Sequence, residues 1–125
     1  MQNLELQDRA ILIVEDEPII SIDLARAFES AGAITAIAAT LQHALVIAED
    51  ENLSAAVIDH VLSDGDTSPL CERLDERGVP FVVYSGVGKV HGTCAKGAQV
   101  SKPEKPDVIV AKVAQLLRQA TEESP

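Results

Sequence analysis

The feature that most constrains this chain is a regular alternation of short apolar runs with longer stretches of helical periodicity. Residues 10–14 form the run Ala-Ile-Leu-Ile-Val, which is rich in β-branched residues and too short for an ordinary helix. From Ile19 to Ala31, apolar side chains instead recur every three or four residues, as in an amphipathic helix. A strand that is apolar along its whole length predicts burial on both faces, as in a parallel sheet.

The same alternation continues to the end of the chain. We expect further strands at residues 34–39, 55–58, 79–84 and 98–101, and further helices at 41–48, 70–77 and 107–120. Residues 86–97 contain four glycines, so any helix there should be short or irregular. Five strands that alternate with helical segments predict a doubly wound α/β domain, with helices on both faces of a five-stranded parallel sheet.

The length of 125 residues fits one domain, so we expect residues 1–125 to form a single unit with a core at about 9–120 and short polar tails. The formal net charge of −10, without a cluster of Lys or Arg, argues against nucleic-acid binding. No apolar run is long enough for membrane insertion. Cys71 and Cys94 lack a CxxC spacing and no signal region is evident, which favours a cytoplasmic protein with reduced thiols.

Polar side chains follow the predicted strands at their carboxyl ends. Glu15 and Asp16 follow the first strand, Asp59 the third, Ser85 the fourth and Lys102 the fifth. In a doubly wound sheet these ends meet at one rim, where ligands bind. Three carboxylates that share a rim repel one another, and a hard divalent cation relieves the repulsion. The sequence therefore predicts a site for Mg²⁺ or Mn²⁺.

A carboxylate beside a bound cation can attack a phosphoryl donor, because the cation and an ammonium neutralise the charge on the transferring group. Asp59 is the predicted nucleophile. Ser85 would donate a hydrogen bond to one phosphoryl oxygen, and Lys102 would pair with another. Gly86 would leave the approach open.

Four blocks in this order, ILIVEDEP, AAVIDHVLSDGD, VVYSG and VSKP, resemble the signature blocks of response-regulator receiver domains of two-component signalling. The resemblance spans about residues 9–120 and implies a flavodoxin-like sheet with strand order 2-1-3-4-5. It also implies a free-standing receiver whose phosphoryl donor is a histidine kinase or a histidine phosphotransfer protein. The output would be binding to a downstream protein, and the receiver would be a monomer or weak dimer.

The resemblance implies a role for each matching residue. Glu15 and Asp16 correspond to the acidic pair that holds the metal, and Asp59 to the phosphoacceptor, which also contacts the metal. Ser85 corresponds to the switch hydroxyl, and Lys102 to a lysine before a cis-proline. Val61 occupies the position whose backbone carbonyl is a metal ligand. Receivers dephosphorylate slowly by themselves, so a multiple-turnover enzyme is not expected.

The chain departs from the family pattern in the regions that form the signalling surface of receiver domains. Gln99 stands where the family has a switch aromatic, the region of the fourth helix is glycine-rich, and a Met-Pro pair after the acceptor is absent. We therefore expect Tyr84, Gly86 and Gln99 to take part in signalling, as phosphorylation draws Ser85 inward and shifts residues 86–97. The end of the fourth strand is similar to that of single-domain receivers of alphaproteobacteria.

Other functions remain open on the sequence. The altered signalling surface would suit a pseudo-receiver that docks without phosphorylation, and the domain could serve as a phosphate sink in a phosphorelay. A phosphatase of the haloacid dehalogenase type needs a DxDx(T/V) motif on the first strand, which this chain lacks. A zinc site from His60, His91, Cys71 and Cys94 lacks suitable ligand spacing. Val61 and Val87 are apolar where polar side chains could position water, which predicts a long-lived phosphoryl group.

Overall fold

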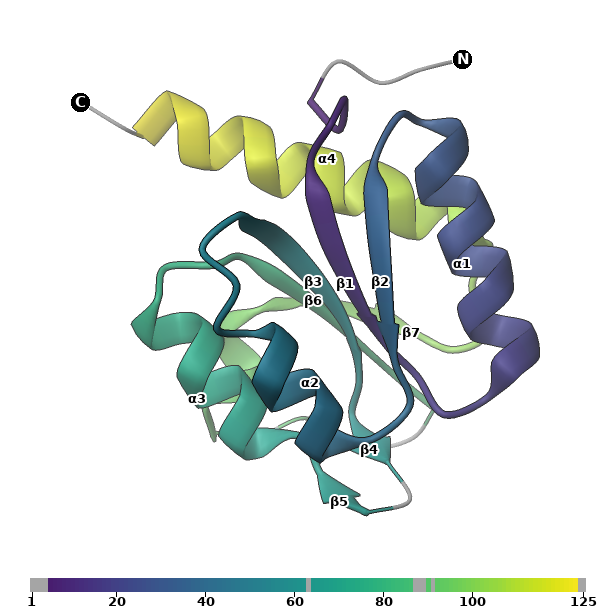
Figure 1. The fold of residues 1–125 in the computed structure, drawn as a ribbon, viewed down its shortest axis with the longest axis vertical. Helices are drawn as coiled ribbons and strands as arrows, with labels where there is room; N and C mark the ends of the chain where they lie inside the picture. The colour runs from purple at the N-terminus through teal and green to yellow at the C-terminus, as the bar shows by residue number, and fades with distance from the viewer. Residues whose placement is uncertain (1–4, 63, 87–89, 91, 124–125) are drawn as a thin grey trace.

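A computed structural model describes residues 5–62, 64–86, 90 and 92–123, without the side chains of Val61 and residues 121–123. It contains a five-stranded parallel sheet of order β2-β1-β3-β6-β7 (Figure 1). The strands are β1 (Ala10–Val14), β2 (Ile34–Ala38), β3 (Leu53–Asp59), β6 (Phe81–Ser85) and β7 (Ala98–Ser101). Taken in chain order, these five strands have the order 2-1-3-4-5, so the predicted fold class is confirmed.

Helices cover both faces of the sheet (Figure 1). The helices are α1 (Pro18–Ser30), α2 (Leu41–Ile47), α3 (Ser68–Glu76) and α4 (Pro106–Glu123). Buried residues of α1 and α4 share one apolar cluster with the sheet, and those of α2 and α3 belong to a second cluster. The domain is thus a three-layer, doubly wound structure with a core on each side of the sheet.

Strand β1 explains why the central strands read as continuous apolar runs. Successive side chains of a strand point to opposite faces. Ile11 and Ile13 accordingly enter the cluster under α1 and α4, whereas Leu12 and Val14 enter the cluster under α2 and α3. All four side chains are at most 1% exposed, so a polar residue at any of them would be buried.

Two glycines follow the ends of helices. Gly32 follows α1 with φ 99°, and Gly78 follows α3 with φ 70°, a backbone region that L side chains rarely adopt. In each case the next residue donates its N–H back into the last turn, from Ala33 to the carbonyl of Phe28 and from Val79 to that of Leu74. This is the hydrogen-bond pattern of a Schellman motif, which turns the chain into the following strand.

Short elements that the sequence pattern does not predict lie in two places, after β3 and before β7. A small antiparallel hairpin of β4 (Val61–Leu62) and β5 (Gly65–Asp66) lies in the turn-rich segment after Asp59. The glycine-rich segment contains the short 3-10 helix η1 (Gly92–Lys96), in agreement with the expected irregular structure. The remaining part of that segment, including Val87, lies outside the described residues.

The expectation of reduced thiols is wrong. Cys71 on α3 and Cys94 in η1 form a disulfide across a sequence separation of 23 residues, and both are fully buried. Their Cα atoms are 5.1 Å apart, within the range that a disulfide requires. The pairing arises because η1 packs against α3, and this tertiary contact has no counterpart in the local spacing of cysteines.

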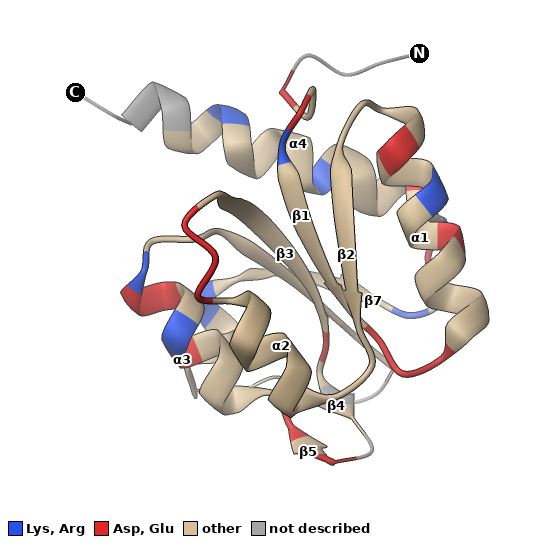
Figure 2. Cartoon of the chain, viewed as in Figure 1, with Lys and Arg blue, Asp and Glu red and all other residues tan. Residues whose placement is uncertain are grey.

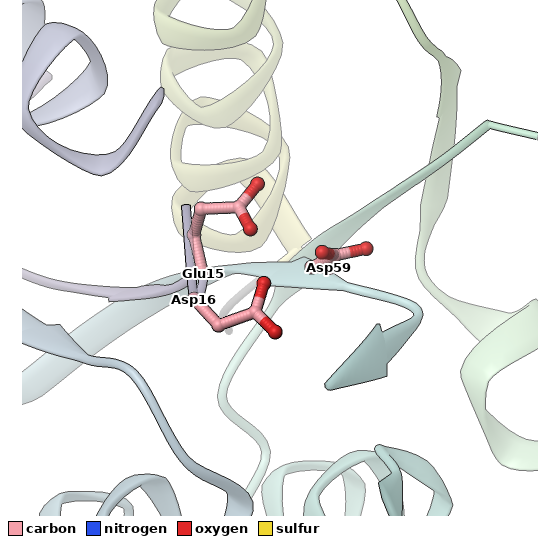
Figure 3. Close-up of side chains that lie close together, drawn as sticks. All are labelled: Glu15, Asp16 and Asp59. Atoms are coloured by element: carbon pink, nitrogen blue, oxygen red, sulfur yellow. The ribbon is translucent and has the colours of Figure 1, made fainter. Parts of the chain in front are cut away.

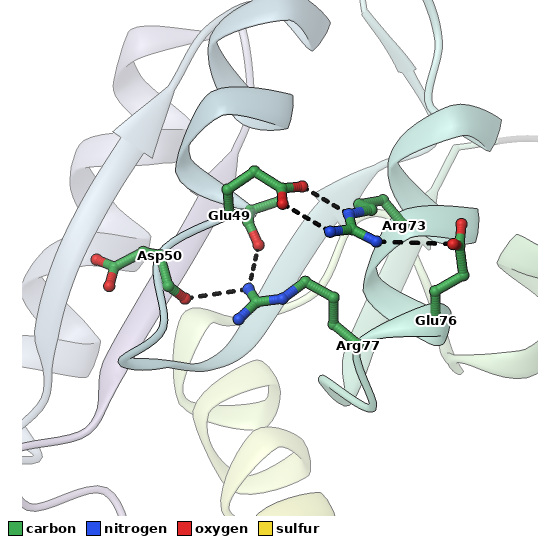
Figure 4. A network of polar contacts seen from close by, with 6 residues as sticks. Glu49, Asp50, Arg73, Glu76 and Arg77 are labelled. Carbon is green, nitrogen blue, oxygen red and sulfur yellow. Dashed lines mark hydrogen bonds and ion pairs between the residues drawn. The ribbon is translucent and has the colours of Figure 1, made fainter.

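A surface network ties α3 to the end of α2 (Figure 4). Arg73 donates to both carboxylate oxygens of Glu49, with distances of 2.6 and 2.7 Å. This guanidinium lowers the pKa of Glu49 below its ordinary value. Arg77 donates to the backbone carbonyls of Ala48 and Asp50 and so satisfies carbonyl groups at the end of α2.

Charged residues are distributed unevenly in the structure. Figure 2 shows an acidic stretch at the carboxyl end of β1, whereas Lys and Arg are scattered over separate elements. Among the described residues, no helix is both long and apolar enough to span a membrane.

Gly97 is needed for packing between η1 and β6. A Cβ added there would lie 2.5 Å from ring atoms of Phe81 and 2.8 Å from its carbonyl oxygen, whereas one added at Gly86 would meet no described atom within 4 Å. We expect Gly97→Ala to lower the free energy of unfolding by about 1–3 kcal/mol through overpacking. Gly86→Ala, the matched control, should change it by less than about 0.5 kcal/mol. Equal urea midpoints for the two variants would contradict this assignment.

Candidate functional site

Three carboxylates lie together at the carboxyl edge of the sheet. β1 and β3 are neighbours with Val14 opposite Ile58, so the residues that follow, Glu15 and Asp59, come side by side. One carboxylate oxygen from each of Glu15, Asp16 and Asp59 lies within 4.8 Å of the other two (Figure 3). The strand pairing therefore assembles the cluster that the sequence predicts at this rim.

This cluster fits a hard divalent cation. Carboxylate oxygens are the ligands that Mg²⁺ prefers, and Mg²⁺ usually retains several waters. Glu15 is 1% exposed and Asp59 8% exposed, while Asp16 is more exposed than either, so water can complete a coordination shell from that side. Two unit charges about 4 Å apart repel by about 4 kcal/mol at an effective dielectric constant of about 20. A cation would remove much of this cost.

Lys102 supplies a positive charge to the buried part of the cluster. Its Nζ lies 3.3 Å from Oδ1 of Asp59 and 3.6 Å from Oε1 of Glu15. The backbone N–H of Lys102 donates to the carbonyl of Ser85 at 2.9 Å, which extends the pairing of β7 with β6 to the rim. The Lys102–Pro103 peptide bond is cis. Lys102 is thus attached to the edge of the sheet and faces the acids.

Tyr84 enters the site from β6. Its hydroxyl donates to Oε1 of Glu15 at 2.6 Å, and its ring centroid lies 4.7 Å from Nζ of Lys102. Burial and the hydrogen bond to Glu15 raise the pKa of Tyr84 far above its ordinary value, so the hydroxyl stays protonated and remains a donor. Sequence reasoning named Tyr84 as a signalling residue but missed its contact with Glu15.

Strand parity provides the signal that would have found this contact. Glu15, Asp59 and Tyr84 each come two residues after a side chain of the cluster under α1 and α4, namely Ile13, Val57 and Val82. Side chains two residues apart on a strand point to the same face. The three polar groups therefore belong to one side of the rim. In the sheet, Tyr84 also lies directly opposite Asp59.

Ser85 and Gly86 lie at the same edge. Ser85 is half-buried and ends β6, one residue beyond the partner of Asp59. Within the part of the chain that the structure describes, a Cβ added at Gly86 would meet nothing within 4 Å. The role of the Ser85 hydroxyl toward a phosphoryl oxygen stays a prediction. The same holds for the backbone carbonyl of Val61, which lies in β4 opposite Asp66.

Gln99 binds to the backbone in and after η1. Its side-chain amide donates to the carbonyls of Cys94 and Gly97, at 3.0 and 2.9 Å. These bonds fasten η1 to the start of β7. At the position expected to carry a switch aromatic, this chain therefore has a glutamine whose amide binds the segment that precedes β7.

Two further residues hold the loop after Asp59, and sequence reasoning missed both. Thr67 is fully buried, and its hydroxyl lies 3.2 and 2.8 Å from the carbonyl oxygens of Asp59 and His60. The carboxylate of Asp64 accepts from the N–H groups of Leu41 at 2.9 Å and Gln42 at 3.4 Å, which caps α2 together with Thr40. Their positions in a turn-rich segment carried no sign of these long-range bonds.

No family model matches the chain. Among curated proteins, the photosynthetic apparatus regulatory protein RegA of Rhodobacter capsulatus is 36% identical over 85 residues, which are 66% of this chain and 46% of that protein. The chain thus matches somewhat less than half of the length of this relative.

Solved structures give a fuller match. A CheY-like response regulator receiver domain protein from Methanospirillum hungatei has a TM-score of 0.84 and 25% identity, over 94% of this chain and 100% of that one. A response regulator receiver protein from Sinorhizobium medicae has a TM-score of 0.80 and 19% identity, over 89% and 95% of the two chains. The second likeness concerns the fold alone.

The acidic cluster predicts a specific response to Mg²⁺. At about 100 times its dissociation constant, Mg²⁺ should stabilise the folded chain by about 2.7 kcal/mol, measured as a rise in melting temperature. Asp16→Asn should raise the melting temperature of the metal-free protein, because a like charge is removed, and should abolish most of the Mg²⁺ response. Asp50→Asn, an exposed change at the opposite edge of the sheet, is the control. An equal Mg²⁺ response in both variants would place the cation elsewhere.

Proposed function

We propose that this chain, which belongs to the response-regulator receiver family, accepts a phosphoryl group on Asp59 and signals through the change that follows. The observation that carries the proposal is the position of Asp59. Its carboxylate belongs to the candidate cation site and also lies 3.3 Å from the ammonium group of Lys102. An acid with a purely structural role in a turn would need neither a cation site nor a lysine beside it.

In the proposed reaction, an oxygen of Asp59 attacks the phosphorus atom of the donor. The new O–P bond forms as the bond from phosphorus to the donor's nitrogen or oxygen breaks, and the leaving atom keeps the electron pair. A bound divalent cation would neutralise charge on the phosphoryl oxygens. Lys102 pairs with another phosphoryl oxygen, which requires it to exchange part of its contact with Asp59 for that oxygen. Ser85 donates a hydrogen bond to a third.

The surface beside the site supports a protein as the donor. A cavity of about 210 Å³ lies next to Lys102 and is lined mainly by apolar residues of α1 and of the start of α4, including Ile20, Leu24 and Ile109. On the same helix, Ile19 is 76% exposed. An apolar cavity with an exposed isoleucine on the same helix, beside a reactive site, suits a protein contact. We propose a histidine kinase or a histidine phosphotransfer protein as the donor.

We propose that the output is a population shift at the end of β6 that a downstream protein reads. Ser85 and Gly86 connect the site directly to the segment that leads to η1. The acidic net charge makes a protein the favoured target rather than nucleic acid. Because the phosphoryl group stays on the chain until hydrolysis, the proposed role is that of a phosphoacceptor and not of a multiple-turnover enzyme.

A pseudo-receiver that docks without phosphorylation is the second candidate. It is favoured by the attachments of η1, which the disulfide links to α3 and Gln99 fastens to β7. Both attachments oppose a large displacement of this segment. Loss of partner binding in Asp59→Asn would support the phosphorylation-dependent role, and unchanged binding would support the pseudo-receiver.

The direct test is the intact mass of the protein after incubation with acetyl phosphate and Mg²⁺. Wild type should gain the mass of one phosphoryl group, and Asp59→Asn should gain none because its amide is a poor nucleophile. Asp50→Asn should behave as wild type, since it removes a carboxylate at the opposite edge of the sheet.

A wild type that gains no mass, or an Asp59→Asn variant that still does, would contradict the proposed acceptor. The decay of the added mass after removal of the donor measures the lifetime of the phosphoryl group. The apolar residue at position 61 supports a lifetime much longer than seconds.

A further inference from the structure

The buried carboxylate of Glu15 is held by donors on both oxygens. Its side chain is 0% exposed. Oε2 accepts from the backbone N–H of Glu17 at 3.1 Å, while Oε1 accepts from Tyr84 at 2.6 Å and lies 3.6 Å from Nζ of Lys102. A buried charge requires such partners, because an unpaired one is costly. Among these partners, the Tyr84 hydroxyl makes the shortest contact.

Tyr84 lies next to Glu15, Asp59 and Lys102. On β6 it lies opposite Asp59 of β3 on one side and opposite Val100 of β7 on the other. Its hydroxyl reaches Glu15, and its ring lies under the ammonium of Lys102 with a separation of 4.7 Å. A cation over an aromatic face is attracted by the ring. One side chain thus contacts both an acid of the candidate cation site and the lysine that pairs with Asp59.

We propose that Tyr84 is the positioning residue of this site, with its hydroxyl orienting Glu15 toward the cation and its ring holding Lys102 beside Asp59. This inference rests on the proposed function, since it concerns the same cation and the same phosphoryl acceptor. It assigns two separable roles to one side chain. The hydroxyl acts on cation binding, and the ring acts on the lysine.

The hydroxyl is suited to this role because it is a neutral donor. It donates to Oε1 of Glu15 at 2.6 Å without adding a positive charge beside a cation. Lys102 alone could not do this, because its charge would repel a divalent ion. Partners that hydrogen-bond to metal-binding carboxylates typically contribute 10–100-fold to metal affinity.

Two substitutions separate the roles. Tyr84→Phe removes the hydroxyl and keeps the ring, so it should raise the dissociation constant for Mg²⁺ about tenfold. At saturating Mg²⁺, its rate of phosphorylation by acetyl phosphate should stay close to that of wild type. Tyr84→Leu removes the ring as well, so its rate should fall even at saturating Mg²⁺. Circular dichroism and urea unfolding verify that both variants are folded.

Thr35→Val is the matched control. The Thr35 hydroxyl also donates to a glutamate, Glu29, at 2.8 Å, but this pair is exposed and lies on β2 and α1, outside the site. Its loss should leave the affinity for Mg²⁺ unchanged. A general effect of removing a hydroxyl–carboxylate bond would appear in this variant as well.

The binding experiment is calorimetric titration with Mg²⁺ alone, without a phosphoryl donor. A weaker affinity in Tyr84→Phe but not in Thr35→Val supports the inference. An unchanged affinity in Tyr84→Phe overturns it, and a tighter affinity overturns it too, because Tyr84 would then compete with the cation for Glu15. Wild type that binds no Mg²⁺ would also overturn it. If wild type binds Mg²⁺ in a Tyr84-dependent manner but gains no phosphoryl group, the proposed function fails and the assignment of Tyr84 stands.

Discussion

Repulsion among three carboxylates at one edge of the sheet is the constraint to which the rest of the site responds. Glu15 and Asp59 are buried there, and each carries a charge that the interior of a protein tolerates only with partners. Lys102 lies within 3.6 Å of both acids, and Tyr84 donates to Glu15. One ammonium cannot neutralise three carboxylates. The remaining negative charge is what makes this edge a site for a divalent cation and a phosphoryl group.

Strand pairing and buried hydrogen bonds hold the backbone around this edge of the sheet. Parallel pairing of β1, β3, β6 and β7 holds the strand ends that carry Asp59 and Tyr84, and Glu15 and Lys102 follow directly after β1 and β7. The buried hydroxyl of Thr67 donates to the backbone carbonyls of Asp59 and His60, and the carboxylate of Asp64 binds the first turn of α2. By contrast, a Cβ added at Gly86 would meet no atom of the described residues within 4 Å, and η1 is the next described element after β6. Ser85 and Gly86 are therefore the residues where a change of charge at Asp59 would first alter the conformation of the chain.

Most of the fold was accessible from the sequence, because each element depends on a local pattern. The apolar run of β1, the helical spacing of α1 and the glycines at positions 32 and 78 are each decided within a few residues of chain. In a doubly wound sheet the carboxyl ends of the strands meet at one edge, so Glu15, Asp59 and Lys102 could be expected there together. The hydrogen bond from Tyr84 to Glu15 was also accessible through strand parity.

Contacts between distant side chains were not accessible in this way. The Cys71–Cys94 disulfide depends on how η1 packs against α3, and the pairing of Arg73 with Glu49 depends on how α3 packs against α2. The bonds of Gln99 to η1 depend on the path of a glycine-rich segment with little periodicity. In each case the partners are chosen by tertiary packing, and no local propensity distinguishes them from other residues of the same type.

The central claim is that the acids at the ends of β1 and β3 form one cation site, and paramagnetic Mn²⁺ can locate that site residue by residue. In amide NMR spectra of the full chain, substoichiometric Mn²⁺ should broaden the signals of Glu15, Asp16, Asp59 and Lys102 first, while Asn52 and Gly78 at the opposite edge stay sharp. Excess Mg²⁺ should restore the broadened signals. Broadening that begins at the hairpin acids Asp64 and Asp66, or that is uniform over this acidic chain, would contradict the account.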